Sequence, residues 1–411
     1  MEKEMRPLLI PAYMEDFSCI GSACEDTCCA GGWMLDIDKK TYQKYKKVND
    51  VELKPLLEKN IARKRSNSSD QSYGKFKLDQ NSACTFLTEE KWCGIQLKLG
   101  EDYLSNTCAV FPRIIRQVDD QVEKSGSLAC PEIARLALLN PNQMEFNAIE
   151  ELKNTPGFIT ASLNTNLSNS NQDNLLREYF WDFRIITIQI LQNRSHKLLD
   201  RMILLGVFYQ KIQDLIDESK FDNISSTIES YHSLMQEQSL TEQFAKLPTK
   251  YTFKVELCKK LLEATFIESP RYKECLNETL SGLALEAGST DDEIKDKYLK
   301  AKESYYVPFI SEKEYIFENY LVNYVFQNMF PYNEKTFFDS YVMLVVQYAL
   351  IEVHLIGMAE FHKGLTEELV IKLVQSFTRT VDHNRPYLNS VIELLKENNI
   401  TTMAHMAILI K

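Results

Sequence analysis

Apolar residues recur every three to four positions through most of the chain after residue 175, which is the spacing of a buried helix face. One such stripe comprises Phe180, Phe183, Ile186, Ile190 and Leu191, and a second comprises Leu198, Met202, Leu205, Phe208, Ile212 and Leu215. The periodicity predicts further helices over 223–236, 252–268, 290–303, 313–328, 335–363, 365–381 and 387–397. Thr366 stands where a helix N-cap is expected. We therefore expect residues 175–411 to form an α-helical domain.

The pattern differs before residue 175. Residues 141–174 are rich in Asn, Ser, Thr and Pro, which predicts a connecting segment. Residues 1–140 show short segments between cysteines, such as TFLTEEKW between Cys84 and Cys93, which is typical of a short hairpin. The expected fold class is mainly α. A cysteine-rich metal or cluster module of short strands or irregular loops comes first, and a larger α-helical region follows.

Composition narrows the class of protein. Hydrophobic residues make up 44% and charged residues 26% of the 411 residues, so the chain can bury a sizeable core and is not wholly disordered. The net charge of −11 disfavours a broad nucleic-acid-binding face, which needs clustered Lys and Arg. The most apolar stretch, 343–359, is interrupted by Gln347, Glu352 and His354, so we expect no stable membrane insertion. Glu, Arg and Pro interrupt the first residues before a signal-peptide core could form, and we expect a cytoplasmic protein.

The cysteines are distributed unevenly. Two of the ten, Cys258 and Cys275, lie in the last 281 residues, and we expect them to be unligated thiols. The other eight lie within the first 130 residues: Cys19, Cys24, Cys28, Cys29, Cys84, Cys93, Cys108 and Cys130. Reduced core cysteines and a disulfide framework are two explanations. Ligation of a metal or cluster is favoured over both, because cysteine clusters in reducing compartments more often bind metal or carry out redox chemistry.

The spacing supports ligation without fixing the ligand set. Cys19-x4-Cys24-x3-Cys28-Cys29 places four thiols within eleven residues. Eight thiols exceed the four that hold one tetrahedral zinc ion or one cubane cluster, so either two centres exist or one centre has additional thiols nearby. Zinc and a cluster held by four thiolates look alike in sequence. A pair of C-x2-C motifs is absent, and Gly31 stands where the C-x3-C-x2-C triplet of radical enzymes would need a cysteine.

Several separated blocks resemble the flagellin lysine N-methylase family. In the first third these are FSCIGSACEDTCCAGGW (17–33), CTFL (84–87), CGIQ (93–96), LSNTCAVFPR (104–113) and LACPEIARL (128–136). Weaker similarity continues in ENY (318–320), FP (330–331) and RTVDHN (379–384). The resemblance implies S-adenosylmethionine-dependent methylation of lysine side chains on flagellin, with a 4Fe-4S cluster held by N-terminal cysteines. The residues alone leave two other classes open: a zinc- or iron-chelating or cluster-carrying protein without methyl transfer, and a non-enzymatic scaffold with structural zinc.

The usual nucleotide-binding signals are absent from the sequence. It has no G-x-G-x-x-G after a strand, no P-loop and only 13 glycines. If the resemblance holds, S-adenosylmethionine binds in another way. Its amino and carboxylate groups could approach the iron, or Arg113 or Arg135 could hold the carboxylate as a bidentate partner. Trp33 could stack on the adenine. The structural alternatives are a supporting salt bridge for Arg113, an ordinary helix-surface charge for Arg135 and a module-core aromatic for Trp33.

The sequence does not identify a catalytic residue. At pH 7 only about one lysine in 2,500 is the neutral nucleophile, so a methylase needs a proton acceptor such as Tyr, Asp or Glu near the amine. Glu318, Asn319 and Tyr320 could line a cleft or make structural polar contacts within an amphipathic helix. His383 follows Asp382. A hydrogen-bonded histidine at a helix end is a simpler interpretation of this residue than a catalytic base.

Overall fold

The computed structural model describes residues 4–31, 33, 35–153, 155, 157–165, 172–237, 244, 246–247, 249–264, 269–285 and 288–411. The chain divides into two compact units. The first comprises Met1–Ala134 with Phe146–Ser162, and the second comprises Arg135–Glu145 with Leu163–Lys411. Helices dominate the described residues, which confirms the mainly α prediction, and the first unit also contains two β-sheets. Part of the predicted connecting segment, 166–171, lies outside the described residues.

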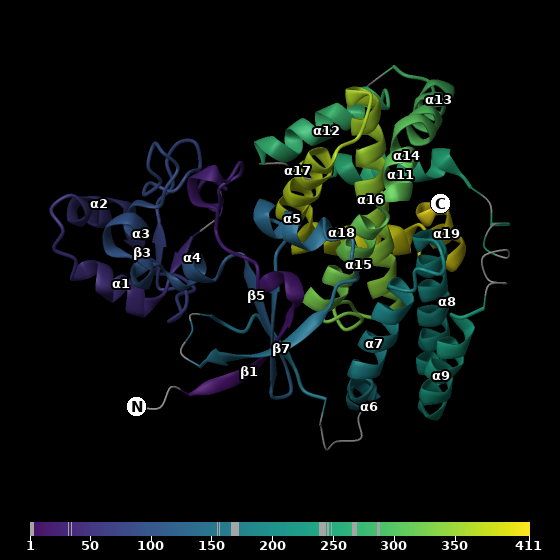
Figure 1. Ribbon diagram of the computed structural model, residues 1–411, viewed down its shortest axis with the longest axis horizontal. Coiled ribbons are helices and arrows are strands. Elements are labelled where there is room, and N and C mark those ends of the chain that lie inside the picture. Colours follow the sequence, from purple (N-terminus) through teal and green to yellow (C-terminus); the bar gives the residue numbers. More distant parts are fainter. Residues whose placement is uncertain are drawn as a thin grey trace. The chain divides into compact units, whose positions relative to one another are not determined.

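A five-stranded sheet organises one part of the first unit, with the strand order β7-β1-β6-β5-β8. Its strands are β1 (Met5–Pro11), β5 (Arg113–Val118), β6 (Gln121–Gly126), β7 (Phe146–Leu152) and β8 (Ala161–Leu163). β1 runs parallel to β6 and antiparallel to β7 (Figure 1). β5 and β6 form a hairpin whose turn contains Asp119 with a φ of 52°. Strand β7 lies in the range that the sequence predicted as a connection.

A smaller antiparallel sheet, with the order β2-β4-β3, lies in the cysteine-rich part of the first unit. Its strands are β2 (Asp36–Ile37), β3 (Ile61–Arg63) and β4 (Gly74–Phe76), and four helices accompany it: α1 (Lys39–Lys46), α2 (Leu53–Asn60), α3 (Gly94–Leu99) and α4 (Asn106–Val110). The Asp38 carboxylate caps α1 and the Ser105 hydroxyl caps α4. Ile37, Tyr45 and Phe76 belong to the small core beneath them. Short paired strands are therefore present in this part of the chain. The segment between Cys84 and Cys93, predicted as a short hairpin, has only isolated bridges, Leu78–Cys84 and Leu87–Cys93.

The second unit is a bundle of helices, as the apolar stripes predicted. The residues of both stripes are buried, and the Thr366 hydroxyl accepts the Leu369 N–H as the predicted N-cap. Helix α5 (Pro131–Leu138) ends in this unit. The remaining helices are α6 (Gln172–Glu178), α7 (Phe180–Leu191), α8 (Leu198–Asp217), α9 (Ile224–Leu234), α11 (Tyr251–Glu263), α12 (Pro270–Gly282), α13 (Asp291–Ala301), α14 (Val307–Glu312), α15 (Tyr315–Gln327), α16 (Phe337–His362), α17 (Glu367–Phe377), α18 (Arg385–Glu397) and α19 (Met403–Ile410).

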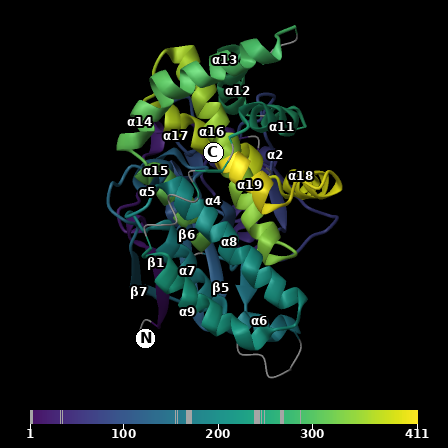
Figure 2. The same cartoon turned by 90° about the vertical axis from the view of Figure 1, so that its right-hand side faces the viewer.

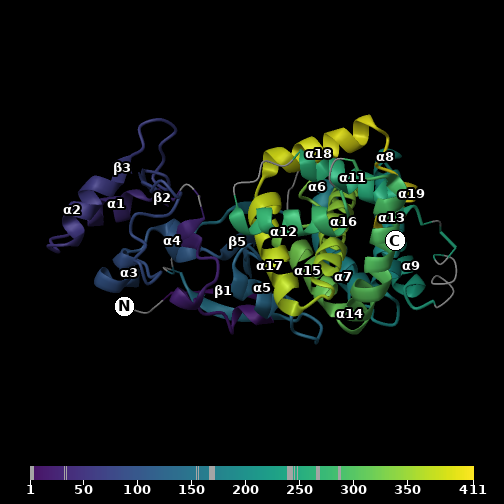
Figure 3. The same ribbon diagram turned by 90° about the horizontal axis from the view of Figure 1, so that it is seen from above.

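Helix α16 is the central element of the second unit. Helices α8 and α19 pack beside it (Figure 2), and α12, α13 and α17 cover other parts of its surface (Figure 3). By length and composition α16 meets the requirements of a membrane span, but its most apolar stretch of 18 residues is wholly buried inside the protein. This burial is that of a core helix, which explains why α16 is apolar on every side.

A close crossing of α12 and α16 depends on two glycines. A Cβ added at Gly282 would lie 2.0 Å from the Gly357 carbonyl oxygen, and a Cβ added at Gly357 would lie 2.8 Å from the Thr279 Cα. Both clashes involve backbone atoms, which a side-chain rotation cannot relieve.

We therefore expect Gly282→Ala to lower the free energy of unfolding by about 1–3 kcal/mol, because the helices must separate to admit one methyl group. Chemical denaturation measures this change. Gly364→Ala is the matched control, because an added Cβ there meets nothing within 4 Å. Equal stability of the two variants would contradict the close crossing.

Candidate cysteine centre

All eight N-terminal cysteines belong to the first unit, and each is a free thiol. Cys84 is buried and Cys19 and Cys28 are exposed, while the other five are half-buried. Cys258 and Cys275 are buried in the second unit. These two thiols therefore belong to the helical core of the second unit and are far in sequence from the eight N-terminal cysteines.

Four of the eight thiols form a mutually interacting set, which we call the inner quartet: Cys29, Cys84, Cys93 and Cys108. In each of the six pairs within the set, the charge of one thiolate raises the pKa of the other thiol. The Cys84 N–H donates to the Cys29 carbonyl at 2.7 Å, which joins two segments 55 positions apart in the sequence. Cys93 immediately precedes α3, and Cys108 lies in the short helix α4. The inner quartet packs against the small core beneath β2, β3 and β4.

Burial dominates the protonation of the inner quartet. Desolvation, together with smaller effects of the neighbouring thiols, raises the pKa of Cys84 and of Cys108 to about 12. Cys29 differs, because a hydrogen bond from the Cys28 thiol lowers its pKa to about 7, with a smaller contribution from the Thr27 hydroxyl. Cys29 is therefore the member of the inner quartet that ionises most readily. A bound cation would offset the cost of ionising the others, because a coordinating thiol is deprotonated by the metal itself.

Backbone N–H groups point at several of the sulfur atoms. The Phe86 N–H donates to the Cys84 sulfur, and the Ile95 and Gln96 N–H groups donate to the Cys93 sulfur. In each case a donor lies two residues after the cysteine, because the chain turns back over the side chain. Such bonds lower the pKa of the thiol, since they stabilise the thiolate. This arrangement suits metal-bound sulfur, whose lone pairs accept N–H bonds in the surrounding protein.

The remaining four cysteines, Cys19, Cys24, Cys28 and Cys130, form a looser outer group. Cys130 interacts with Cys19 and with Cys24, and Cys28 interacts with Cys19. Cys130 precedes α5 and its sulfur accepts N–H bonds from Glu132 and Ile133 at the start of that helix. Cys28 also interacts with Cys29 and Cys108, so it connects the outer group with the inner quartet.

The donor chemistry of the inner quartet fits a thiolate-bound metal or cluster. It offers four sulfur ligands with N–H donors, the number that holds a 4Fe-4S cluster or a structural zinc ion. Among the described residues, however, no group of three or more Cys, His, Asp or Glu side chains is gathered into a metal-coordinating arrangement. The sulfur atoms are therefore neighbours without forming a coordination polyhedron.

The three residues predicted to bind the methyl donor occupy different settings. Arg113 begins β5, and its guanidinium lies 5.1 Å from the ring centre of Phe17, close in sequence to Cys19. Trp33 makes an edge contact with Phe111 at 5.2 Å and packs against the small core, as its structural alternative expects. Arg135 lies in α5, in the part that belongs to the second unit. The roles of all three in binding the donor remain predictions.

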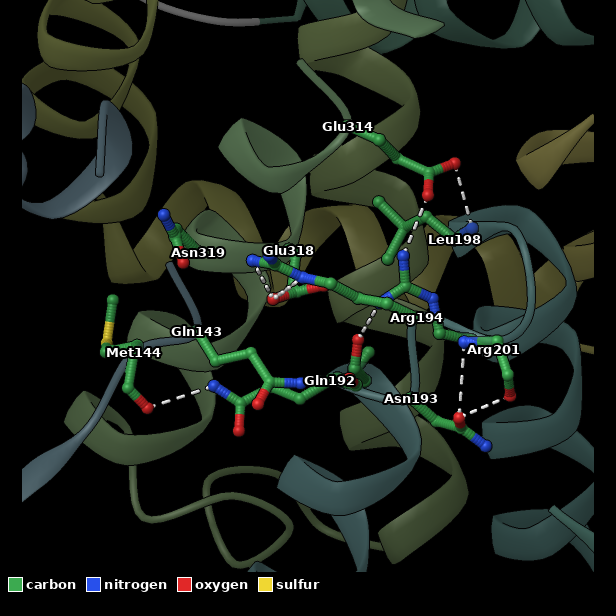
Figure 4. Close-up of polar contacts among 12 residues, drawn as sticks. Gln143, Met144, Gln192, Asn193, Arg194, Leu198, Arg201, Glu314, Glu318 and Asn319 are labelled. Carbon is green, nitrogen blue, oxygen red and sulfur yellow. Dashed lines mark hydrogen bonds and ion pairs between the residues drawn. The ribbon is translucent and has the colours of Figure 1, made fainter. Parts of the chain in front are cut away.

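The Glu318 carboxylate in α15 has a structural environment. It is fully buried, and Arg194 and Arg201 both donate to it, with contacts of 2.8 and 2.6 Å (Figure 4). Arg201 also pairs with the half-exposed Glu314 at 2.8 Å. The Asn319 amide donates to the Asn140 carbonyl at 2.8 Å. Glu318 and Asn319 therefore make structural polar contacts, the second of the two interpretations given for this segment.

The chain is similar to lysine N-methylases over nearly its whole length. It is 26% identical to the lysine-N-methylases of Salmonella typhimurium and Salmonella choleraesuis, covering 96% of this chain and 98% of each relative. It is 38% identical to the flagellar biosynthetic protein FliU of Salmonella muenchen over 135 residues, which are 33% of this chain and 78% of that protein.

The family described as the FliB lysine N-methylase C-terminal domain matches residues 184–409, more than half of the chain. The chain therefore belongs to the FliB lysine N-methylase family, which confirms the resemblance drawn from the sequence. No solved structure matches the chain.

Proposed function

We propose that this protein is a flagellin lysine N-methyltransferase that uses S-adenosylmethionine and holds a 4Fe-4S cluster with the inner quartet. The observation that carries the proposal is full-length similarity to lysine-N-methylases in a chain whose first unit brings four thiols together. Flagellin as the substrate rests on the flagellar name of one relative and on the family resemblance. The sulfur donors with their N–H bonds support the cluster.

The cluster would supply an iron position that can bind the amino and carboxylate groups of the methyl donor. Arg113 is the residue of this chain best placed along the sequence to hold that carboxylate, because β5 follows the Cys108 segment directly and Arg113 faces Phe17. A guanidinium suits this role, since it binds a carboxylate through two parallel N–H bonds. Direct displacement at the methyl group then needs a neutral lysine amine and no radical.

Two measurements test the proposal. Protein purified without oxygen should be brown, contain about four iron and four sulfide per chain if one cluster is present, and lose its colour with a chelator and oxidant. Incubation with methyl-labelled S-adenosylmethionine and unmethylated flagellin should place label on lysine. A flagellin whose lysines have been chemically acetylated is the control and should remain unlabelled.

The outcomes separate the alternatives. A colourless protein with stoichiometric zinc and full methyl transfer would remove the cluster from the proposal while leaving the enzyme. An iron-containing protein that transfers no label would favour a cluster carrier or chelator. A zinc protein without transfer would favour a structural scaffold.

A further inference from the structure

A cavity lies between helices α11 and α13 of the second unit. Its volume is about 190 Å³, and the described residues that line it come from one face of each helix and from the segment that precedes α13. An apolar cavity of about 150 Å³ holds benzene, whereas pockets for drug-sized ligands measure roughly 300–1,000 Å³. The cavity is therefore large enough for one amino-acid side chain and too small for a nucleotide.

Apolar side chains form the most buried part of the cavity wall. Val255 and Leu285 are each 3% exposed, Tyr298 is fully buried, and Ile294 is half-buried. A ligand group that displaces water from these side chains is favoured if it is apolar, because binding then removes apolar surface from water. The inner part of the ligand is therefore expected to be an aliphatic or aromatic group.

The two tyrosines of the cavity wall already have a cation. The rings of Tyr251 and Tyr298 lie 5.6 Å apart, and the Lys302 ammonium lies over them at 5.4 and 5.8 Å. Lys302 also pairs with the buried Glu352 at 3.7 Å. Aromatic rings attract cations, but here the chain itself provides one. We therefore do not expect the charged end of a ligand to bind against these rings.

Four charged side chains complete the cavity wall. Each helix contributes one acid and one lysine: Glu256 and Lys259 come from α11, and Asp291 and Lys295 come from α13. None of the four side chains makes an ion pair or a hydrogen bond within the described residues. Opposite charges therefore line one cavity without meeting across it. A ligand that carries both signs of charge can pair with them.

A free α-amino acid combines these properties in one small molecule. Its ammonium group donates hydrogen bonds, its carboxylate accepts them, and both are attached to the carbon that carries the side chain. The same groups within a peptide are uncharged amides, which would leave the charges of the cavity without partners. The paired charges and the apolar wall thus favour a free amino acid over a peptide segment.

We propose that the cavity between α11 and α13 binds a free α-amino acid whose side chain is apolar and of leucine to phenylalanine size. The carboxylate of the ligand lies at Lys259 and Lys295, and its ammonium group lies at Glu256 and Asp291. Its side chain packs on the apolar wall. The site belongs wholly to the second unit and needs neither methyl donor nor flagellin, so it stands or falls independently of the proposed methyl transfer.

The first test is calorimetric titration of the full-length protein with L-leucine, L-methionine and L-phenylalanine. At least one of the three should bind with a Kd below about 1 mM. Its N-acetyl derivative and its methyl ester should each bind at least about tenfold more weakly, because each lacks one of the two charges. Absence of binding by all three at about 10 mM would overturn the inference. So would equal binding of the N-acetyl amide, which imitates a peptide segment.

The second test compares neighbouring charges that differ only in whether they line the cavity. Asp291 and Asp292 are both exposed in the first turn of α13, but Asp292 is not part of the cavity wall. Lys259 and Lys260 are related in the same way in α11. Asp291→Asn and Lys259→Gln should weaken amino-acid binding about fivefold or more, whereas Asp292→Asn and Lys260→Gln should leave it unchanged. Equal effects within either pair would contradict the site.

The third test asks whether the ligand's side chain enters between the helices. Ile294→Ala shortens one side chain of the apolar wall and enlarges the cavity. The ratio of the affinities for L-phenylalanine and L-leucine should therefore rise about threefold or more, because the larger side chain gains more from the added space. Circular dichroism confirms that the variant is folded. An unchanged ratio in a folded variant would show that the side chain lies elsewhere and would overturn the inference.

Discussion

Replacing Cys84 by serine should reduce bound iron to less than about a tenth and abolish methyl transfer, with the same result at Cys29, Cys93 and Cys108. Serine has nearly the shape of cysteine but is a poor ligand for cluster iron, and four thiolates are what such a cluster requires. Cys84 is the most buried of the four, and the Phe86 N–H already points at its sulfur. Iron and sulfide analysis of protein purified without oxygen, together with the labelled-methyl assay, measures both effects.

Two control sets define what this result means. Cys258→Ala and Cys275→Ala remove buried thiols of the second unit and should leave the iron content unchanged. Cys130→Ser tests the outer group and should retain most of the iron. If Cys130→Ser releases iron as completely as Cys84→Ser, the outer group also provides ligands and the assignment to the inner quartet alone is wrong. Iron loss in the Cys258 or Cys275 variant would contradict the assignment to the N-terminal cysteines.

Glu318→Gln should lower the free energy of unfolding of the second unit by about 3–5 kcal/mol, because it leaves two arginines without their buried counter-charge. Arg201 is almost wholly buried, and Glu318 is the partner that it shares with Arg194. Glutamine keeps the shape and one acceptor oxygen, so the measured loss reports the charge. Urea denaturation followed by circular dichroism gives the change.

Glu314→Gln is the matched control for this network. Glu314 pairs with the same arginine at 2.8 Å, but its side chain is 38% exposed, so water can replace much of the interaction. We expect a loss of about 1 kcal/mol or less, as for other solvent-exposed ion pairs. Equal losses in the two variants would show that burial of Glu318 does not control the strength of this network.

The helical part of the fold could be predicted from the sequence, since its signals are local. Apolar positions spaced along α7 and α8 and the cap at Thr366 depend on neighbours within a few residues. The five-stranded sheet could not be predicted in this way. β1 pairs with β7, and the two are separated by more than a hundred residues. In β6 the buried residues include Glu123 and Lys124, so the alternation of polar and apolar residues that marks a strand is lost.

The same distinction applies to the candidate cysteine centre. Cysteine count and spacing predicted a centre in the first third of the chain. They did not divide the eight thiols, because Cys29 and Cys84 become neighbours through a backbone contact between distant segments.

The burial of α16 has a consequence for how the chain is made. Helices α17, α18 and α19 follow α16 in the sequence and pack against it. During synthesis the apolar helix α16 therefore emerges before the helices that bury it have been made. At that stage it is long and apolar enough to be drawn into a lipid bilayer or to stick to other nascent chains. A chaperone that binds α16 on the ribosome would shield its apolar surface until the later helices pack against it. A gene truncated after α16 would yield insoluble protein.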